Sequence, residues 1–157
     1  KNNLPQTQSI ARYHFLRFDH YHTPNILAAN AIQLDSTLGY VDRVGFYNGT
    51  CHPFFLFDLS KNDITSVLEV PLILMDSALL YAHYMDVKLS EIEEKVESMM
   101  HIVNEQSGML VVNLHPNNYS RFDDPRYRHL LETLITSSKK YALKSLKWSS
   151  LSSLRFK

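Results

Sequence analysis

The chain has 157 residues, of which 45% are hydrophobic, and its 16 basic residues balance 16 acidic ones. This length and composition predict one globular domain, or a large part of one, and exclude wholesale disorder. The zero net charge excludes a protein that binds nucleic acid through overall positive charge. The single cysteine, Cys51, excludes an internal disulfide and a multi-cysteine zinc site. No hydrophobic run approaches the roughly 20 residues of a transmembrane segment, and the first residues lack the apolar core of a signal peptide.

The charge is unevenly distributed along the chain. Residues 139–157 contain six basic residues and no acidic one, whereas residues 1–138 contain 10 basic and 16 acidic residues. We interpret 139–157 as a basic C-terminal segment that packs on the domain formed by 1–138, with its lysines in water. The mixture of lysines with Trp148, Leu151 and Leu154 would also suit an anionic membrane surface or a partner protein.

The first half of the chain predicts short strands around one helix. Residues 13–18 (YHFLRF) are aromatic and apolar, as is typical of a strand. Thr23 and Pro24 predict an N-cap with proline at the first helical position. Residues 35–40 and 54–59 predict two further short strands. The helix should direct these residues inward: Ile26, Leu27, Ala31 and Leu34.

The middle of the chain contains the most continuous hydrophobic run, residues 68–75 (LEVPLILM), which predicts a strand covered on both faces. A short helix is expected over 77–84. Ser90 and Glu93 form a capping box of the S-x-x-E type, and Gly108 is the expected C-cap of the helix that follows. Residues at helical spacing along that helix should face the core: Ile92, Val96, Met99 and Val103.

The last elements are a second buried strand over 109–114 (MLVVNL) and a helix that opens at Asp124-Pro125. This helix is expected to direct five residues inward: Tyr127, Leu130, Leu131, Leu134 and Ile135. Strands that alternate with helices predict an α/β fold with a parallel sheet, where function gathers at the carboxyl ends of the strands. Three polar residues are predicted to lie at such ends: Arg17, Asp76 and His115.

Several segments, in this order, resemble one family, the polysaccharide deacetylases (NodB-homology domains of carbohydrate esterase family 4). The similar segments are FLRF at 15–18, TPNIL at 23–27, LDSTL at 34–38, EVP at 69–71 and LHP at 114–116. Residues 45–54 are similar to an insertion found in one bacterial branch, where arginine is usual at the position of His52. The resemblance spans residues 11–136 and implies an irregular (β/α) barrel. It also implies a bacterial protein of the cytoplasm or the cell envelope.

The family resemblance implies metal-dependent removal of acetyl groups from an N-acetylated carbohydrate. By this resemblance, His115 would protonate the leaving amine, Asp76 would orient His115, and Arg17 would fix the catalytic aspartate. Asp35 is the alternative partner for His115. The expected contacts with substrate come from Leu114, Asp35 and Tyr40. An amide has a poor leaving group, so its hydrolysis needs an activated water, a base and a proton donor, and histidine suits the last task.

The chain departs from the family in its first residues. The catalytic aspartate and the Asp-His-His set that binds zinc or a similar divalent metal lie before the arginine motif in the family, and residues 1–16 contain neither. We therefore expect this chain to be the C-terminal part of the barrel, with the metal ligands outside it. The isolated chain should bind no catalytic metal tightly and should not hydrolyse amides. Exposed strand edges should make it dimerise, or associate with the missing half.

Two other interpretations remain open. The chain could be a non-catalytic carbohydrate-binding or assembly module that keeps the deacetylase fold, or a different α/β protein in which Arg17, Asp76 and His115 do not meet. Other candidate groups are weaker. His20 and His22 lack an acidic partner for a metal site, Asp123-Asp124 suits a helix N-cap, and the adjacent Cys51 and His52 rarely face one atom.

Overall fold

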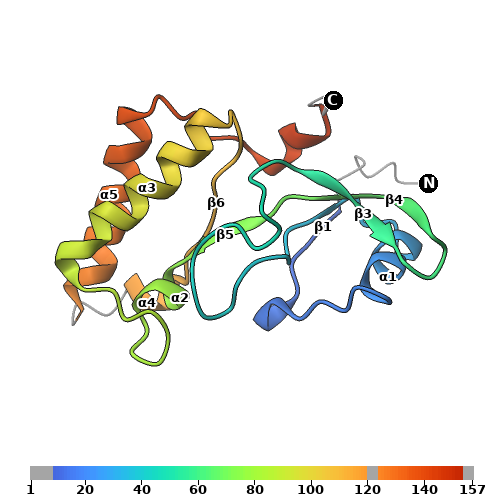
Figure 1. Cartoon of the computed structure of the whole chain (residues 1–157), viewed down its shortest axis with the longest axis horizontal. Helices are drawn as coiled ribbons and strands as arrows, with labels where there is room; N and C mark the ends of the chain where they lie inside the picture. The colour runs from blue at the N-terminus through green and yellow to red at the C-terminus, as the bar shows by residue number, and fades with distance from the viewer. Residues whose placement is uncertain (1–8, 120–123, 154–157) are drawn as a thin grey trace, which may run out of the picture. The chain divides into compact units, whose positions relative to one another are not determined.

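The protein is described by a computed structural model that covers residues 9–119 and 124–153 and contains two compact units (Figure 1). Of the described residues, unit 1 comprises 9–38, 53–70 and 146–153, and unit 2 comprises 39–52, 71–119 and 124–145. Each unit has its own hydrophobic core. The predicted mixed α/β class with parallel strands is confirmed, although the strands of the described residues close no barrel.

Unit 1 is built on a four-stranded sheet in the order β1-β2-β4-β3. Its strands are β1 (Ile10–Ala11), β2 (Leu34–Asp35), β3 (Phe54–Asp58) and β4 (Asp63–Glu69). The first three in spatial order run parallel, and β3 pairs antiparallel with β4. Helix α1 (Thr23–Ala29) begins at the predicted Thr23-Pro24 and contributes Leu27 to the core. The other core residues are Leu38, Leu56 and Val67.

The predicted strand over 13–18 is wrong. Residues His14–Leu16 form a 3-10 helix in which Phe15 and Leu16 have φ angles of 57° and 50°, a left-handed conformation that cannot continue a strand. The strand comes earlier, as β1. The predicted strand over 35–40 is confirmed only at Asp35. Ile26 and Ala31, expected inside, are exposed.

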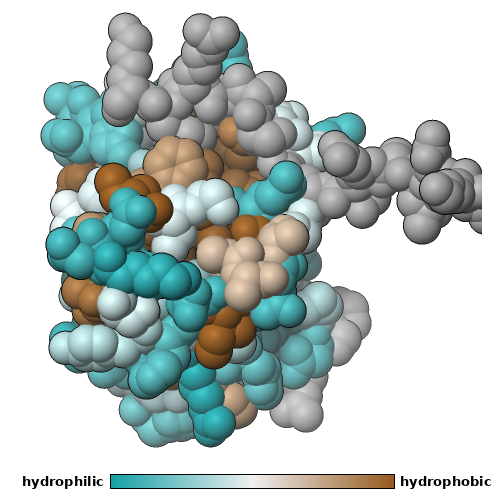
Figure 2. Space-filling view, turned by 90° about the vertical axis from the view of Figure 1, so that its right-hand side faces the viewer, coloured by the Kyte–Doolittle hydropathy of each residue, from teal (hydrophilic) through white to brown (hydrophobic). Residues whose placement is uncertain are grey.

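The outer face of the β3–β4 hairpin carries exposed hydrophobic side chains. Phe55 and Phe57 alternate with the buried Leu56, and Phe57 lies opposite Ile64 across the strand pair. Their exposed fractions are 51%, 43% and 65% for Phe55, Phe57 and Ile64. The face in Figure 2 shows hydrophobic side chains interspersed with hydrophilic ones. Exposed apolar surface is therefore present, and the dimerisation expected from it stays a prediction.

Unit 2 has a parallel strand pair, β5 (Leu72–Met75) and β6 (Val111–Asn113). Its helices are α2 (Asp76–Leu80), α3 (Ile92–Glu105), α4 (Pro116–Tyr119) and α5 (Pro125–Lys140). Helices α3 and α5 lie side by side (Figure 1). Among the described helices, none has both the length and the hydrophobicity to cross a membrane.

The continuous strand predicted over 68–75 is wrong, because it divides into the end of β4 and the whole of β5. The Val70 N–H donates to Asp35 O at 2.8 Å in unit 1, whereas Leu72 pairs with Val111 in unit 2. Pro71, between them, has no N–H to donate to a strand ladder. The hydrophobic run therefore serves two sheets.

The helical spacing predicted for α3 is confirmed, since Ile92, Val96, Met99 and Val103 are all buried. The ends of α3 differ from the prediction. A 3-10 helix over Leu89–Glu91 precedes α3, and the Glu91 carboxylate accepts the Lys88 N–H at 3.3 Å in place of the predicted Ser90–Glu93 box. At the C-terminus, Ser107 takes the left-handed φ of 51° that the sequence assigns to Gly108.

Gly108 is instead a point of close packing. Its N–H donates to Val103 O at 2.8 Å, and the next residue, Met109, donates its N–H to Cys51 O at 2.8 Å. A Cβ atom at residue 108 would overlap Cys51 Sγ and come within 3.0 Å of Cys51 O. Gly108 thus lets the loop that carries Cys51 lie against the start of the segment leading to β6.

Helix α5 begins where predicted, and Asp124 accepts the Arg126 N–H at 3.0 Å as its N-cap. Tyr127, Leu130 and Leu134 are buried as expected. Leu131 and Ile135, also expected inside, are exposed. The buried face of α5 is therefore narrower than its hydrophobic pattern indicates. The helix continues to Lys140, so the expected boundary after residue 138 falls inside it. Residues 148–153 form a further 3-10 helix in unit 1.

Candidate functional site

The candidate site of unit 2 is a contact between Asp76 and His115. Asp76 is the first residue of α2, directly after β5, and His115 follows β6 by one residue. Because β5 and β6 are parallel and Met75 pairs with Asn113, their carboxyl ends adjoin. His115 Nδ1 lies 2.5 Å from Asp76 Oδ1, and the His115 N–H donates to Asp76 Oδ2 at 2.8 Å. The same carboxylate therefore fixes both the backbone and the ring of His115.

The Asp76 side chain is fully buried yet well supplied with hydrogen-bond donors. Besides His115, the Ser77 N–H donates to Oδ1 at 2.7 Å and Asn118 Nδ2 donates to Oδ2 at 3.3 Å. Burial of a carboxylate is costly unless donors replace its water. Ser77 of α2 is the local donor, whereas His115 and the α4 residue Asn118 are 39 and 42 positions further along the chain, so the pairing of β5 with β6 is needed to complete the site.

This contact determines the form of the imidazole. A hydrogen bond from Nδ1–H to the carboxylate selects the tautomer in which the neutral ring keeps its proton on Nδ1. Nε2 is then the nitrogen that can gain or lose a proton. The His115 side chain is 40% exposed while Asp76 is 0% exposed. The arrangement can therefore hold an accessible imidazole in one orientation and one tautomer.

Three tyrosines surround this pair. The Tyr81 hydroxyl donates to Asn118 Oδ1 at 3.3 Å, and the rings of Tyr119 and Tyr127 meet edge to face at 5.7 Å. Burial, and then the negative charge of Asp76, raises the pKa of Tyr119; burial, with smaller effects of Tyr81 and Asp76, raises the pKa of Tyr127 to about 12. Both phenols stay neutral at physiological pH, so they add no charge beside the carboxylate.

The remaining predicted site residues are divided between the two units. In unit 2, Leu114 packs at the edge of the core, and Tyr40 contacts Tyr47 with ring centroids 5.1 Å apart. In unit 1, Asp35 is buried and accepts hydrogen bonds from Thr37. Arg17 follows the 3-10 helix, not a strand as predicted, and is exposed with its guanidinium 6.0 Å from the Phe15 ring centroid. Their roles at a substrate stay predictions.

Unit 1 has its own polar group at the carboxyl ends of three parallel strands. Arg12 directly follows β1, Asp35 ends β2 and Glu69 ends β4. Arg12 was missed because the wrong strand over 13–18 moved the first strand end from Arg12 to Arg17, and Glu69 had no predicted role because the run over 68–75 predicts one continuous strand. One sequence feature could have identified Arg12, Asp35 and Glu69: each ends or directly follows a short apolar stretch.

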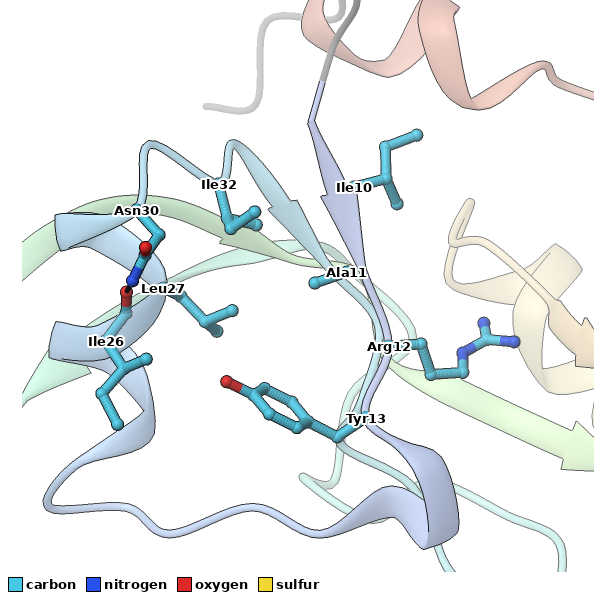
Figure 3. Close-up of a pocket in the computed structure, with 8 residues that line it drawn as sticks. All are labelled: Ile10, Ala11, Arg12, Tyr13, Ile26, Leu27, Asn30 and Ile32. Atoms are coloured by element: carbon cyan, nitrogen blue, oxygen red, sulfur yellow. Dashed lines mark hydrogen bonds between the residues drawn. The ribbon is translucent and has the colours of Figure 1, made fainter.

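A pocket of about 370 Å³ also lies in unit 1, between β1 and α1 (Figure 3). Its walls are mainly apolar: Ile10, Ala11, Ile26, Leu27 and Ile32. The Tyr13 hydroxyl points into it, whereas the side chain of Arg12, the one charged lining residue, points away. The pocket therefore presents no charged group to a ligand.

The described residues do not fit the divalent metal that the family resemblance implies. Nowhere in residues 9–119 and 124–153 do three or more His, Cys, Asp or Glu side chains gather to hold an ion. His22 contacts Asp19 at 3.0 Å, and Asp124 serves as the N-cap of α5. Asp123 lies outside the described residues.

Comparison with protein-family profiles, curated proteins and solved structures finds no match to this chain. The geometry of the Asp76–His115 pair and the motif resemblance are therefore the basis for a functional proposal.

Proposed function

We propose that this chain takes part in the hydrolysis of N-acetyl groups on a carbohydrate, with His115 as the acid that protonates the leaving amine. The observation that carries the proposal is the buried Asp76 carboxylate bonded to the partly exposed His115 ring. The order of the deacetylase-like motifs supports the same reaction class. The parallel strands of both units are compatible with part of a NodB-type (β/α) barrel.

In the proposed step, Asp76 holds the His115 ring through Nδ1–H. The cationic imidazole carries its second proton on Nε2. As the C–N bond of the substrate breaks, the Nε2–H bond breaks too and its proton joins the departing nitrogen. His115 returns to the neutral Nδ1–H form, which the hydrogen bond to Asp76 already favours. The step thus needs no rearrangement of the pair.

A divalent metal, when bound, would supply an activated water in such a reaction. The described residues provide no set of three ligands for such a metal. The proposal for this chain concerns the orientation of His115 and the transfer of its proton.

The test measures acetate release from N-acetylchitooligosaccharides by the complete natural polypeptide that contains these residues, supplied with Zn²⁺ or Co²⁺. We expect His115→Ala to lower kcat by about 10²- to 10⁴-fold, the usual contribution of a general acid. The control is His101→Ala, which removes an exposed histidine on α3 and should leave kcat unchanged. Unaltered kcat in His115→Ala would contradict the assigned role. Sugar binding without acetate release would instead favour the non-catalytic carbohydrate-binding module.

A second measurement separates positioning from simple structural support. In ¹⁵N NMR spectra of the chain, the neutral His115 ring should carry its proton on Nδ1. Asp76→Asn places an amide where the carboxylate was, and its NH₂ group can donate to Nδ1, so the ring proton should move to Nε2. If both proteins show the same tautomer, Asp76 does not orient the ring.

A further inference from the structure

The buried acidic pair of unit 1, Asp35 and Glu69, takes no part in the proton transfer proposed for His115. Strands β2 and β4 are parallel neighbours, and their register places Asp35 directly opposite Glu69. Both side chains are 0% exposed. Two carboxylates that are brought together without water repel each other strongly, so the fold must compensate at least one of the charges.

The hydrogen bonds of the pair leave one oxygen without a partner. Asp35 Oδ1 accepts the Thr37 hydroxyl at 2.8 Å, and Oδ2 accepts the Thr37 N–H at 3.2 Å. Glu69 Oε1 accepts the Leu38 N–H at 3.0 Å, but Glu69 Oε2 is buried with no donor among the described residues. A proton on Glu69 Oε2 would remove the charge and turn this orphaned acceptor into a donor toward the adjacent Asp35.

The charge of Arg12 is balanced when Asp35 and Glu69 together carry one proton. Arg12, which follows β1, is the cation that acts on both acids, and it donates Nε–H to Ser36 O at 2.8 Å and Nη2–H to Ser36 Oγ at 2.9 Å. With one proton on the pair, the cluster of Arg12, Asp35 and Glu69 is neutral; with none, it holds an uncompensated negative charge.

Among the described residues of β3 and α1, no charged side chain offsets the negative charge of this cluster. On β3, the residue opposite Glu69 in the strand register is Phe54. The acid of β3, Asp58, lies opposite Asp63 at the other end of β4, and its carboxylate contacts Lys61 Nζ at 3.2 Å. Helix α1 (TPNILAA) has no titratable side chain.

We propose that Asp35 and Glu69 share one proton in a carboxyl–carboxylate hydrogen bond, and that this proton locks β2 to β4, so that unit 1 loosens when it leaves. The proposal rests on the strand register, the burial and the orphaned oxygen, and it is independent of the proposed deacetylation.

The direction of the pH effect follows from the Glu69 carboxyl. Burial first, and then the hydrogen bond and charge of Asp35, raise the pKa of Glu69 from 4.5 to about 9. Between these values the folded chain keeps a proton that the unfolded chain has lost. The contribution of this proton is therefore complete below pH 4.5 and is lost as the pH rises toward 9.

The test is urea unfolding of the full chain between pH 5 and 9, followed by the fluorescence of Trp148, which belongs to unit 1 and is the single tryptophan. The folding equilibrium constant of the wild type should fall relative to that of Glu69→Gln, by up to about tenfold per pH unit. Glutamine keeps a neutral donor for Asp35 at every pH. The matched control, Asp63→Asn, changes an exposed acid on the same strand and should follow the wild type.

Parallel pH curves for the wild type and Glu69→Gln would overturn the shared proton. A measurement on the unmodified chain covers the case in which Glu69→Gln does not fold. The ¹³C shift of the Glu69 side-chain carboxyl should remain that of a protonated acid at pH 7. The shift of an ionised carboxylate at pH 7 would overturn the proposal equally.

Discussion

Gly108→Ala is expected to destabilise unit 2 by about 3 kcal/mol, the upper part of the range for forced overpacking. The added methyl group would overlap Cys51 Sγ and press on the Cys51 carbonyl oxygen at 3.0 Å. The contact with backbone matters most, because a carbonyl group that is hydrogen-bonded to Met109 cannot rotate away as a side chain can. The measurement is urea unfolding followed by far-UV circular dichroism.

Two controls separate this steric effect from the backbone preference of glycine. Gly49→Ala places a methyl group in open space at a φ of 68°, so it should cost only about 1 kcal/mol, the conformational penalty. Cys51→Ala combined with Gly108→Ala removes the overlapping sulfur and should recover part of the loss. Equal costs for Gly49→Ala and Gly108→Ala, without recovery in the double variant, would contradict the packing explanation.

Leu79→Ala is expected to destabilise unit 2 by about 3 kcal/mol, since it empties a fully buried site in the core. Leu79 lies on α2, three residues after Asp76, so the same helix that fills the core also places the carboxylate. We therefore expect the cavity to broaden the NMR signals of the His115 ring as well as to lower the unfolding free energy.

The matched control is Leu89→Ala, which removes the same atoms from a side chain that is 44% exposed. Its cost should stay below about 1 kcal/mol, and the His115 signals should not change. A Leu79→Ala protein with wild-type stability would mean that α2 is not anchored by its core contacts.

The sequence was most informative about helices, through the periodicity of α3 and the capping residues of α5. The spacing of Ile92, Val96, Met99 and Val103 identified α3, and Asp124-Pro125 identified the start of α5, because helix formation depends mainly on neighbours along the chain. The run at 68–75 misled for the opposite reason. Hydrophobicity does not reveal which sheet a residue joins, and the division at Pro71 is decided by hydrogen bonds to distant segments.

The Asp76–His115 pair and the Asp35–Glu69 pair also differ in how far the sequence predicted them. The sequence placed Asp76 and His115 at the ends of clearly hydrophobic strands, whereas their pairing was an implication of the family resemblance, with Asp35 as the alternative partner. The opposition of Asp35 and Glu69 could not be predicted, since the predicted strands 35–40 and 68–75 placed both residues near strand starts, whereas they end β2 and β4. Arg12 was missed because β1 has only two residues, too few for an alternating pattern.

The packing of Gly108 on Cys51 has a practical consequence. Cys51 is 3% exposed, and burial raises the pKa of its thiol, so neither the sulfur nor its reactive thiolate is presented to solvent. Because Cys51 is the one thiol in the sequence, its rate of chemical labelling measures how often unit 2 opens. The rate at which a small alkylating reagent labels the native chain would report how often this loop parts from the segment leading to β6, without any introduced probe.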